Sequence, residues 1–196
     1  MYQHIASLEK DIADFTGSPY VVATDCCTHA IEIAFILKQV KHVKFPCRTY
    51  LSIPMMCKKI KVEYQLIDEV WKGQYQFKDT NIWDSALTLQ PNMYKKGQIQ
   101  CLSFGNDKPL NAKRGGCILL DNYNDYMKLK MMAYDGRDLS ITPWQDQKQF
   151  NIGYHYNMSI EHSIKCRDML KEYIAQGNFA SKIKKYPDCR NIEIHG

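Results

Sequence analysis

The feature that most constrains the fold is the regular alternation of short apolar strand patterns with amphipathic helical patterns. The expected strands span 20–24, 42–46, 62–68, 80–84, 99–104 and 115–122. The expected helices span 3–16, 28–40, 54–60, 124–136 and 159–176. Strands that alternate with helices indicate βαβ units. We therefore expect an α/β fold built on a mostly parallel sheet.

Length and charge limit the architecture and the classes of partner. A chain of 196 residues with 45% apolar residues suits a single domain, 1–196, with its own core. Its apolar runs are too short to cross a bilayer, and the amphipathic start does not resemble a signal peptide, so we expect a cytoplasmic protein without a membrane partner. The net charge of +5 comes with basic residues in the last third but no interleaved aromatic motif. We expect no nucleic-acid partner and a solvated polar tail.

The eight cysteines predict neither disulfides nor a metal centre. No C-x-x-C pair occurs, and Cys26 and Cys27 are adjacent, which suits neither a bridge between them nor a zinc site. A cytoplasmic chain of this size does not need disulfides for stability. Reduced and mostly buried thiols are the expectation.

Candidate functional residues follow the expected strands. Parallel α/β sheets bind ligands beyond the carboxyl ends of their strands. Four segments lie there: 25–28, 49–50, Asp84 and 103–108. Asp84 could be an ordinary helix cap, or a carboxylate that keeps a heterocyclic nitrogen protonated. Lys108 could be a solvated loop lysine, or one that forms a Schiff base.

The segment CCTHAIEIAF adds a helix start suited to phosphate. Free N–H groups at a helix N-terminus bind anions, and Thr28 adds a hydroxyl, although an ordinary N-cap would look the same. Ser103 offers a second hydroxyl at a strand end, and Tyr50 offers an aromatic face for a planar ring. Each signal is weak alone. Together with Lys108 and Asp84 they form the set that pyridoxal phosphate (PLP) requires.

Five segments, in order, resemble the DegT-like nucleotide-sugar aminotransferases, which are PLP enzymes with the aspartate-aminotransferase-like fold. SFGNDKPLNAKRGG (103–116) is similar to the family's S-F-x-x-x-K-x-L-x-x-x-x-G-G, and this match is the most specific. WDSAL (83–87) resembles E-D-A-A-Q, and CCTHAI (26–31) resembles S-G-T-x-A-L. PCRTYLSI (46–53) resembles P-x-x-T-F-x-A-T, and GYHYNMS (153–159) resembles G-Y-N-Y-R-M-S.

The chain also departs from this pattern. Cys27 replaces a glycine, Leu87 replaces a glutamine, and Lys113–Arg114 replaces glycine-glutamate before the glycine pair. His155 replaces the asparagine that reaches a neighbouring subunit's phosphate, and Asn157 replaces an arginine. The stretch between 68 and 83 is shorter than in the family, and the small C-terminal domain is expected to be largely absent, leaving 177–196 as a polar tail.

The resemblance implies a fold, a reaction and a set of roles. The fold would be a three-layer α/β/α arrangement, a reduced version of the family's large domain. The activity would be transfer of an amino group from an amino acid, expected to be glutamate, to a nucleotide-linked keto sugar in amino-sugar biosynthesis. PLP would alternate with pyridoxamine phosphate (PMP), with Lys108 as Schiff-base lysine.

The remaining roles and the alternatives also follow from the resemblance. The cofactor-binding residues would be Cys27, Thr28, Tyr50, Asp84, Ser103 and His155. A homodimer with a shared active site is expected, with His155 supplied in trans. Two alternatives remain: a non-catalytic relative that acts as a binding or scaffold protein, and another PLP-dependent reaction on a sugar.

Overall fold

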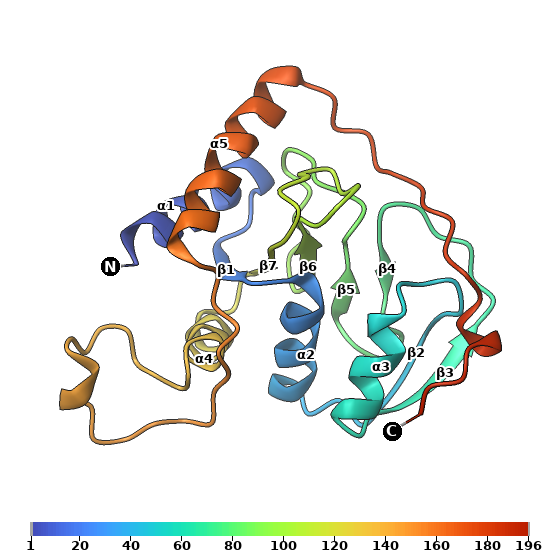
Figure 1. Ribbon diagram of the computed structural model, residues 1–196, viewed down its shortest axis with the longest axis horizontal. Helices are drawn as coiled ribbons and strands as arrows, with labels where there is room; N and C mark the ends of the chain where they lie inside the picture. The colour runs from blue at the N-terminus through green and yellow to red at the C-terminus, as the bar shows by residue number, and fades with distance from the viewer. Residues whose placement is uncertain (1, 196) are drawn as a thin grey trace.

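The computed structural model describes residues 2–195, which form one α/β body (Figure 1). A five-stranded sheet has the order β1-β7-β6-β5-β4, and β2 and β3 form a separate pair. The strands are β1 (Tyr20–Thr24), β2 (His42–Pro46), β3 (Glu63–Ile67), β4 (Tyr75–Gln76), β5 (Ile82–Asp84), β6 (Ile99–Ser103) and β7 (Gly116–Leu120). The α-helices are α1 (Gln3–Thr16), α2 (Cys27–Leu37), α3 (Ser52–Lys59), α4 (Tyr123–Ala133) and α5 (Ile160–Gln176). Two short 3₁₀ helices are η1 (Trp144–Asp146) and η2 (Cys189–Asn191).

The main sheet is mixed, so the expectation of a mostly parallel sheet was wrong. β5 and β6 run parallel, whereas β7 runs antiparallel to both β6 and β1, and β4 runs antiparallel to β5. The reason lies in the connections. A parallel neighbour requires a long crossover, but β6 leads to β7 through the loop 104–115 and β4 leads to β5 through the turn 77–81. Neither connection contains a helix.

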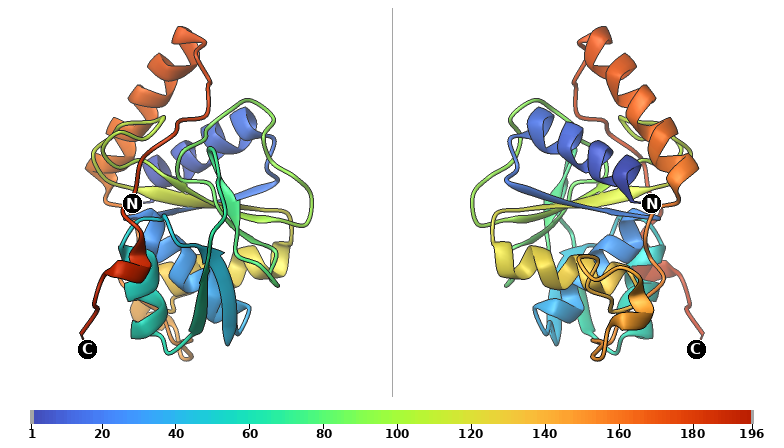
Figure 2. Two further views of the ribbon diagram at one scale, coloured as in Figure 1. Left: turned by 90° about the vertical axis from the view of Figure 1, so that its right-hand side faces the viewer. Right: turned by 90° about the vertical axis from the view of Figure 1, so that its left-hand side faces the viewer.

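Helices cover both faces of the sheet, which gives the expected three layers. Figure 2 shows α1 and α5 on one side and α2, α3 and α4 on the other. α2 is apolar around most of its circumference because it packs against β6 and β7 on one side and against α3 and α4 on the other. β7 is buried along its whole length. The core therefore lies on both faces of the β6–β7 pair.

Two helices differ from the expected bounds for local reasons. α3 begins at Ser52, ahead of Pro54, because proline is tolerated in the first turn, where its missing N–H is not needed. α4 ends at Ala133, because Asp135 and Gly136 adopt positive φ angles of 58° and 75°. Residues 137–152 then leave the body as an excursion, seen at the lower left of Figure 1, before Tyr134 and His155 bridge its two ends.

The polar C-terminal segment is solvated along most of its side chains, as expected, but its backbone is hydrogen-bonded to the body at two places. We call residues 178–195 the C-terminal strap; it runs back along the molecule (Figure 1, red). The Lys182 N–H donates to the Leu87 carbonyl at 2.8 Å, and the Gly73 N–H donates to the Lys182 carbonyl at 3.3 Å. Farther along, the Cys189 N–H donates to the Cys47 carbonyl at 2.9 Å.

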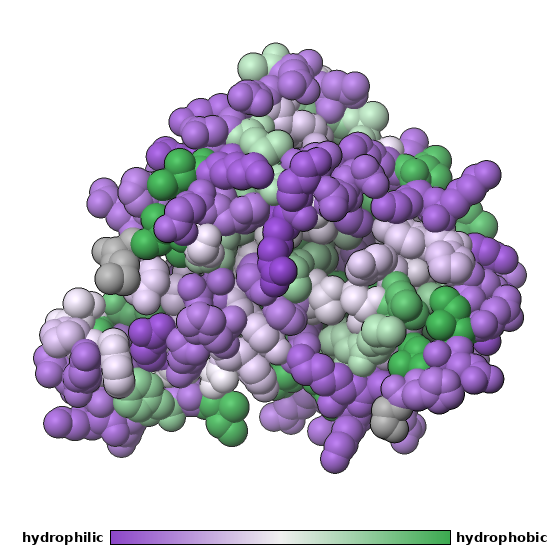
Figure 3. All heavy atoms as spheres, in the orientation of Figure 1, coloured by the Kyte–Doolittle hydropathy of each residue, from purple (hydrophilic) through white to green (hydrophobic). Residues whose placement is uncertain are grey.

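The surface is polar over most of the face seen in Figure 3, with an apolar group at the lower right and smaller ones along the left and lower edges. Within residues 2–195, no helix combines the length and the apolar character that crossing a membrane requires.

Candidate active site

A cavity of about 550 Å³ opens beside the carboxyl ends of β5 and β6. The first turn of α2, the start of α3, the loop 104–115 and the strap surround it. The cavity is lined by the predicted residues Cys27, Thr28, Tyr50, Asp84, Ser103 and Lys108. Segments far apart in the sequence thus meet at one place, as the strand-end argument predicted.

Lys108 extends into this cavity from the loop that follows β6. Its Nζ donates a hydrogen bond to the Tyr186 hydroxyl at 3.2 Å, and no other partner of this amine occurs within residues 2–195. The backbone of the same loop is held from outside, because Lys182 Nζ donates to the Lys108 carbonyl at 2.8 Å. The loop is therefore anchored while the amine remains accessible from the cavity.

Asp84 is a buried carboxylate at the end of β5 and only 4% of it is exposed. Its Oδ1 accepts a hydrogen bond from the Ala86 N–H at 3.0 Å. Burial raises the pKa of Asp84, although the Ala86 N–H, the charge of Lys108 and the Tyr75 hydroxyl partly oppose this. Among residues 2–195, no cationic side chain contacts Asp84 as an ion pair, and Lys108 acts on it only through its charge. A protonated ring nitrogen would supply the missing positive charge, so this carboxylate fits a pyridinium.

The first turn of α2 faces the cavity with hydroxyl groups nearby. Thr28 Oγ1 lies 2.7 Å from Ser52 Oγ, and Ser103 Oγ accepts a hydrogen bond from the Gly105 N–H at 3.4 Å. The helix start packs very close to β7, since a Cβ on Gly116 would lie 2.6 Å from the Cys27 nitrogen. Helix N–H groups and hydroxyls suit a phosphate.

The Cys27 side chain is buried at the inner wall, where its thiol donates to the Cys101 carbonyl at 3.5 Å. Burial raises the pKa of the Cys27 thiol well above its usual range, so the group stays neutral. Cys27 can therefore contact a ligand through its backbone and its neutral sulfur but does not provide a thiolate.

Tyr50 and His155 differ in how they relate to the cavity. Tyr50 lies at its rim and is 60% exposed, with the Tyr186 ring 6.3 Å away. Stacking of Tyr50 on a cofactor stays a prediction. His155 does not line the cavity: it is exposed and its Nδ1 lies 3.2 Å from Asp135 Oδ1. A role for His155 within one chain is therefore not supported by its position.

Several lining residues were not predicted from the sequence. Trp71 and Tyr186 stack with their rings 6.0 Å apart and only 12° from parallel. Lys184 lines the same wall from the strap. No local pattern indicates these residues, because two of them belong to a segment that reads as a polar tail. Tyr186 and Lys184 reach the cavity because the strap passes it, and no residue spacing in the sequence predicts the path of the strap.

A charged network borders the α2 end of the cavity. Asp25 accepts from Arg114 Nη2 at 3.0 Å and lies 2.6 Å from His29 Nδ1. Burial opposes protonation of His29, but hydrogen bonding to Asp25 and the nearby Cys26 outweigh it and raise its pKa to about 9. The His29 ring also stacks on Tyr156 at 3.7 Å. His29 and Arg114, which both line the cavity, thus place two cationic side chains around one carboxylate.

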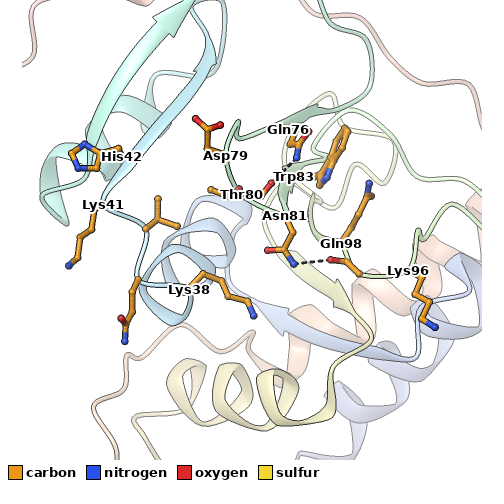
Figure 4. A pocket seen from close by; sticks show the side chains of 13 residues that line it. Lys38, Lys41, His42, Gln76, Asp79, Thr80, Asn81, Trp83, Lys96 and Gln98 are labelled. Carbon is orange, nitrogen blue, oxygen red and sulfur yellow. Dashed lines mark hydrogen bonds between the residues drawn. The ribbon is translucent and has the colours of Figure 1, made fainter.

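A second hollow of about 750 Å³ lies before the amino ends of β5 and β6 (Figure 4). Its walls carry Lys41, His42, Lys96 and Trp83, and Lys38 is already paired with Asp125. Asn81 and Gln76 bond backbone carbonyls rather than facing a ligand. This open basin contains none of the predicted residues, so the smaller cavity at the carboxyl ends is the candidate site.

Comparison with known proteins supports the fold assignment. No family model matches this sequence, and no curated protein matches it. Solved structures do match. The sugar aminotransferase CalS13 from Micromonospora echinospora is 13% identical with a TM-score of 0.72, and the match covers 88% of this chain and 61% of that one.

Two further structures give the same result. A DegT DnrJ EryC1 StrS aminotransferase from Brucella abortus is 14% identical with a TM-score of 0.70, covering 87% of this chain and 58% of that one. Ntda from Bacillus subtilis with bound cofactor PMP is 16% identical with a TM-score of 0.71, covering 87% and 48%. The chain has the fold of the DegT-type sugar aminotransferases. It spans about half to three fifths of the length of these structures.

Proposed function

We propose that this protein is a PLP-dependent aminotransferase that moves an amino group from an amino acid, with glutamate as the expected donor, to a nucleotide-linked keto sugar. The observation that supports it best is the pairing of Lys108 with Asp84 in one cavity. Lys108 and the buried Asp84 line the same cavity, and among residues 2–195 the carboxylate has no ion-pair partner. Neither feature is needed for packing, and both suit a pyridine cofactor.

Each lining residue has a defined task in this proposal. When bound, PLP supplies the electron sink that stabilises negative charge on the carbon undergoing deprotonation. Lys108 holds the cofactor through its amine and, once free, moves a proton to or from that carbon. Asp84 keeps the proton on the ring nitrogen. Thr28, Ser103 and the first turn of α2, including the Cys27 backbone, hold the phosphate, and Tyr50 covers one ring face.

We also propose that two copies of the chain complete the site. The excursion 137–152 exposes apolar side chains beside His155, with Trp144 51%, Phe150 47% and Ile152 85% exposed. Burial of these groups against a second copy would remove apolar surface from water and could bring His155 to the partner's phosphate position. Sedimentation of the wild type as a dimer, and of Trp144→Glu as a monomer, would support this; a monomeric wild type would contradict it.

One observation favours a second candidate function, a binding protein without turnover. Leu87 is buried and apolar, 1% exposed, at the position where the family has a glutamine. Leu87 does not line the cavity, so this position offers no polar side chain to a cofactor oxygen. Under this alternative the cavity would bind its ligand without a bond to Lys108.

The deciding experiment is the visible absorbance of the purified protein with added PLP. A yellow band is expected in the wild type and in Lys95→Ala, which removes an exposed lysine that does not line the cavity. The band should be absent in Lys108→Ala and should change when glutamate is added to the wild type. A band that persists in Lys108→Ala, or no band in any protein, would contradict the aminotransferase and leave the binding protein.

A further inference from the structure

The C-terminal strap is held at both ends by loops that form the cavity. At one end Lys182 exchanges backbone hydrogen bonds with Gly73 and Leu87, while Ser181 Oγ donates to Thr88 Oγ1 at 2.9 Å. At the other end Cys189 is buried, and its thiol donates to the Thr49 carbonyl at 3.6 Å. The strap thus passes the cavity between two hydrogen-bonded anchors, although residues 183–185 are exposed.

Tyr186 lies between the two anchors and extends into the cavity. Its ring stacks on Trp71 and lies near the Tyr50 ring. Burial, together with the charge of Asp84, raises the pKa of Tyr186 to about 12. The phenol therefore keeps its proton at physiological pH. A neutral phenol can accept a hydrogen bond from an ammonium group or donate one to a free amine.

Lys108 needs such a partner. A lysine side chain has four rotatable bonds, so an amine without a partner would sample much of the cavity. The loop carbonyl of Lys108 is fixed by Lys182, and the amine is fixed by Tyr186. Both contacts come from the strap, which thus orients the backbone and the reactive end of the same residue.

We infer that Tyr186 is a positioning residue of the site, whose hydroxyl holds the Lys108 amine toward the cavity through the path of the C-terminal strap. The inference rests on the proposed function, because the orientation of the Lys108 amine affects activity only if Lys108 reacts with a cofactor. It extends that function by assigning part of the lysine's orientation to a residue 78 positions along the chain.

The test measures the reactivity of the Lys108 amine in the cofactor-free protein. Trace acetic anhydride labels free amines, and peptide mass spectrometry reports the labelling rate of each lysine over a range of pH. In Tyr186→Phe the ring and its stacking on Trp71 are kept and only the hydroxyl is lost. Lys108 Nζ donates to this hydroxyl, so its loss removes an acceptor that stabilises the unreactive ammonium form, and Lys108 labelling at neutral pH should rise about three- to tenfold, the effect of one hydrogen bond.

Controls separate positioning from packing. Tyr64→Phe removes a half-buried phenol on β3, outside the cavity, and should leave Lys108 labelling unchanged. Tyr186→Ala removes ring and hydroxyl together. If Tyr186 only packs, Tyr186→Phe will match the wild type while Tyr186→Ala differs, and the inference is overturned. Equal labelling of Lys108 in all four proteins would overturn it as well.

Failure of the proposed function is distinguishable from failure of this inference. The labelling experiment contains no PLP, so it reports on Tyr186 alone. If labelling rises in Tyr186→Phe but the wild type gives no lysine-dependent yellow band, the inference about Tyr186 stands and the aminotransferase proposal is contradicted. A yellow band together with unchanged labelling in Tyr186→Phe supports the aminotransferase and removes Tyr186 from its site.

Discussion

The His29–Asp25 pair at the cavity wall predicts a loss of stability as the pH rises. The pKa of His29 is raised from 6.5 to about 9 in the folded protein, against the opposing effect of burial. Binding of a proton to His29 therefore stabilises the folded protein relative to the unfolded chain between pH 6.5 and about 9. The stabilisation is fully present below pH 6.5, where an unfolded histidine is also protonated, and it is lost as the pH rises to about 9.

The magnitude follows from the shift and from the exposure of the ring. A difference of about 2.5 pH units corresponds to at most about 3.4 kcal/mol, at 1.36 kcal/mol per unit. About a quarter of the His29 side chain is exposed, at 26%, and water screens part of the interaction. We expect the free energy of unfolding to fall by about 1–2 kcal/mol between pH 6.5 and 9.

Urea denaturation, followed by tryptophan fluorescence at constant ionic strength, measures this change. His29→Gln removes the titrating group and serves as the comparison. The free energy of unfolding of His29→Gln should change by less than half as much over the same pH range. The reason is that Asp25 and Arg114, the other members of this network, keep their charges between pH 6.5 and 9. The reasoning is refuted if wild type and His29→Gln lose the same stability between pH 6.5 and 9.

Three further predictions concern the residues around the cavity. Asp84→Asn should raise the melting temperature of the cofactor-free protein at neutral pH and less near pH 4, because the raised pKa means that ionisation of Asp84 destabilises the fold above its ordinary value of 3.8. The same variant should bind PLP more weakly, and an unchanged melting temperature at both pH values would contradict this reasoning. Gly116→Ala should destabilise by about 3 kcal/mol or more in urea, because its Cβ would meet backbone atoms at 2.6 and 2.7 Å, whereas Gly105→Ala, with its nearest contact at 3.5 Å, should be close to wild type. A thiol reagent should label Cys26 quickly and the seven buried cysteines only on unfolding; rapid labelling of several thiols in the native protein would argue against this burial.

Much of the fold was predictable because local signals agreed with tertiary packing. α1 and β1 have the predicted bounds, and α5 begins one residue after the predicted start, since Ser159 caps it by accepting from the His162 N–H. β4 was missed because two residues carry no periodicity. The direction of β7 was mispredicted because strand patterns do not encode direction. Only the helix-free loop 104–115 indicates it, because a parallel neighbour would require a longer crossover.

The candidate site was predictable where residues follow strands. Asp84, Ser103 and Lys108 meet because β5 and β6 are parallel neighbours whose carboxyl ends adjoin. Tyr186 was not predictable, because its place depends on a chain path fixed by Lys182 and Cys189 rather than by its own neighbours. Non-local contacts of this kind leave no spacing signal in a single sequence.

The position of the strap near residue 189 has a consequence for folding during synthesis on the ribosome. The loops that contain Asp84 and Lys108 are synthesised well before the strap, and β6 and β7 can pair as soon as residue 120 is available. The cavity wall, however, needs Tyr186 and the anchor at Cys189. A nascent chain would therefore fold its sheet with an open and loosely held lysine loop. The cavity would take its final shape only after residue 189 had left the exit tunnel, later than the pairing of β6 with β7.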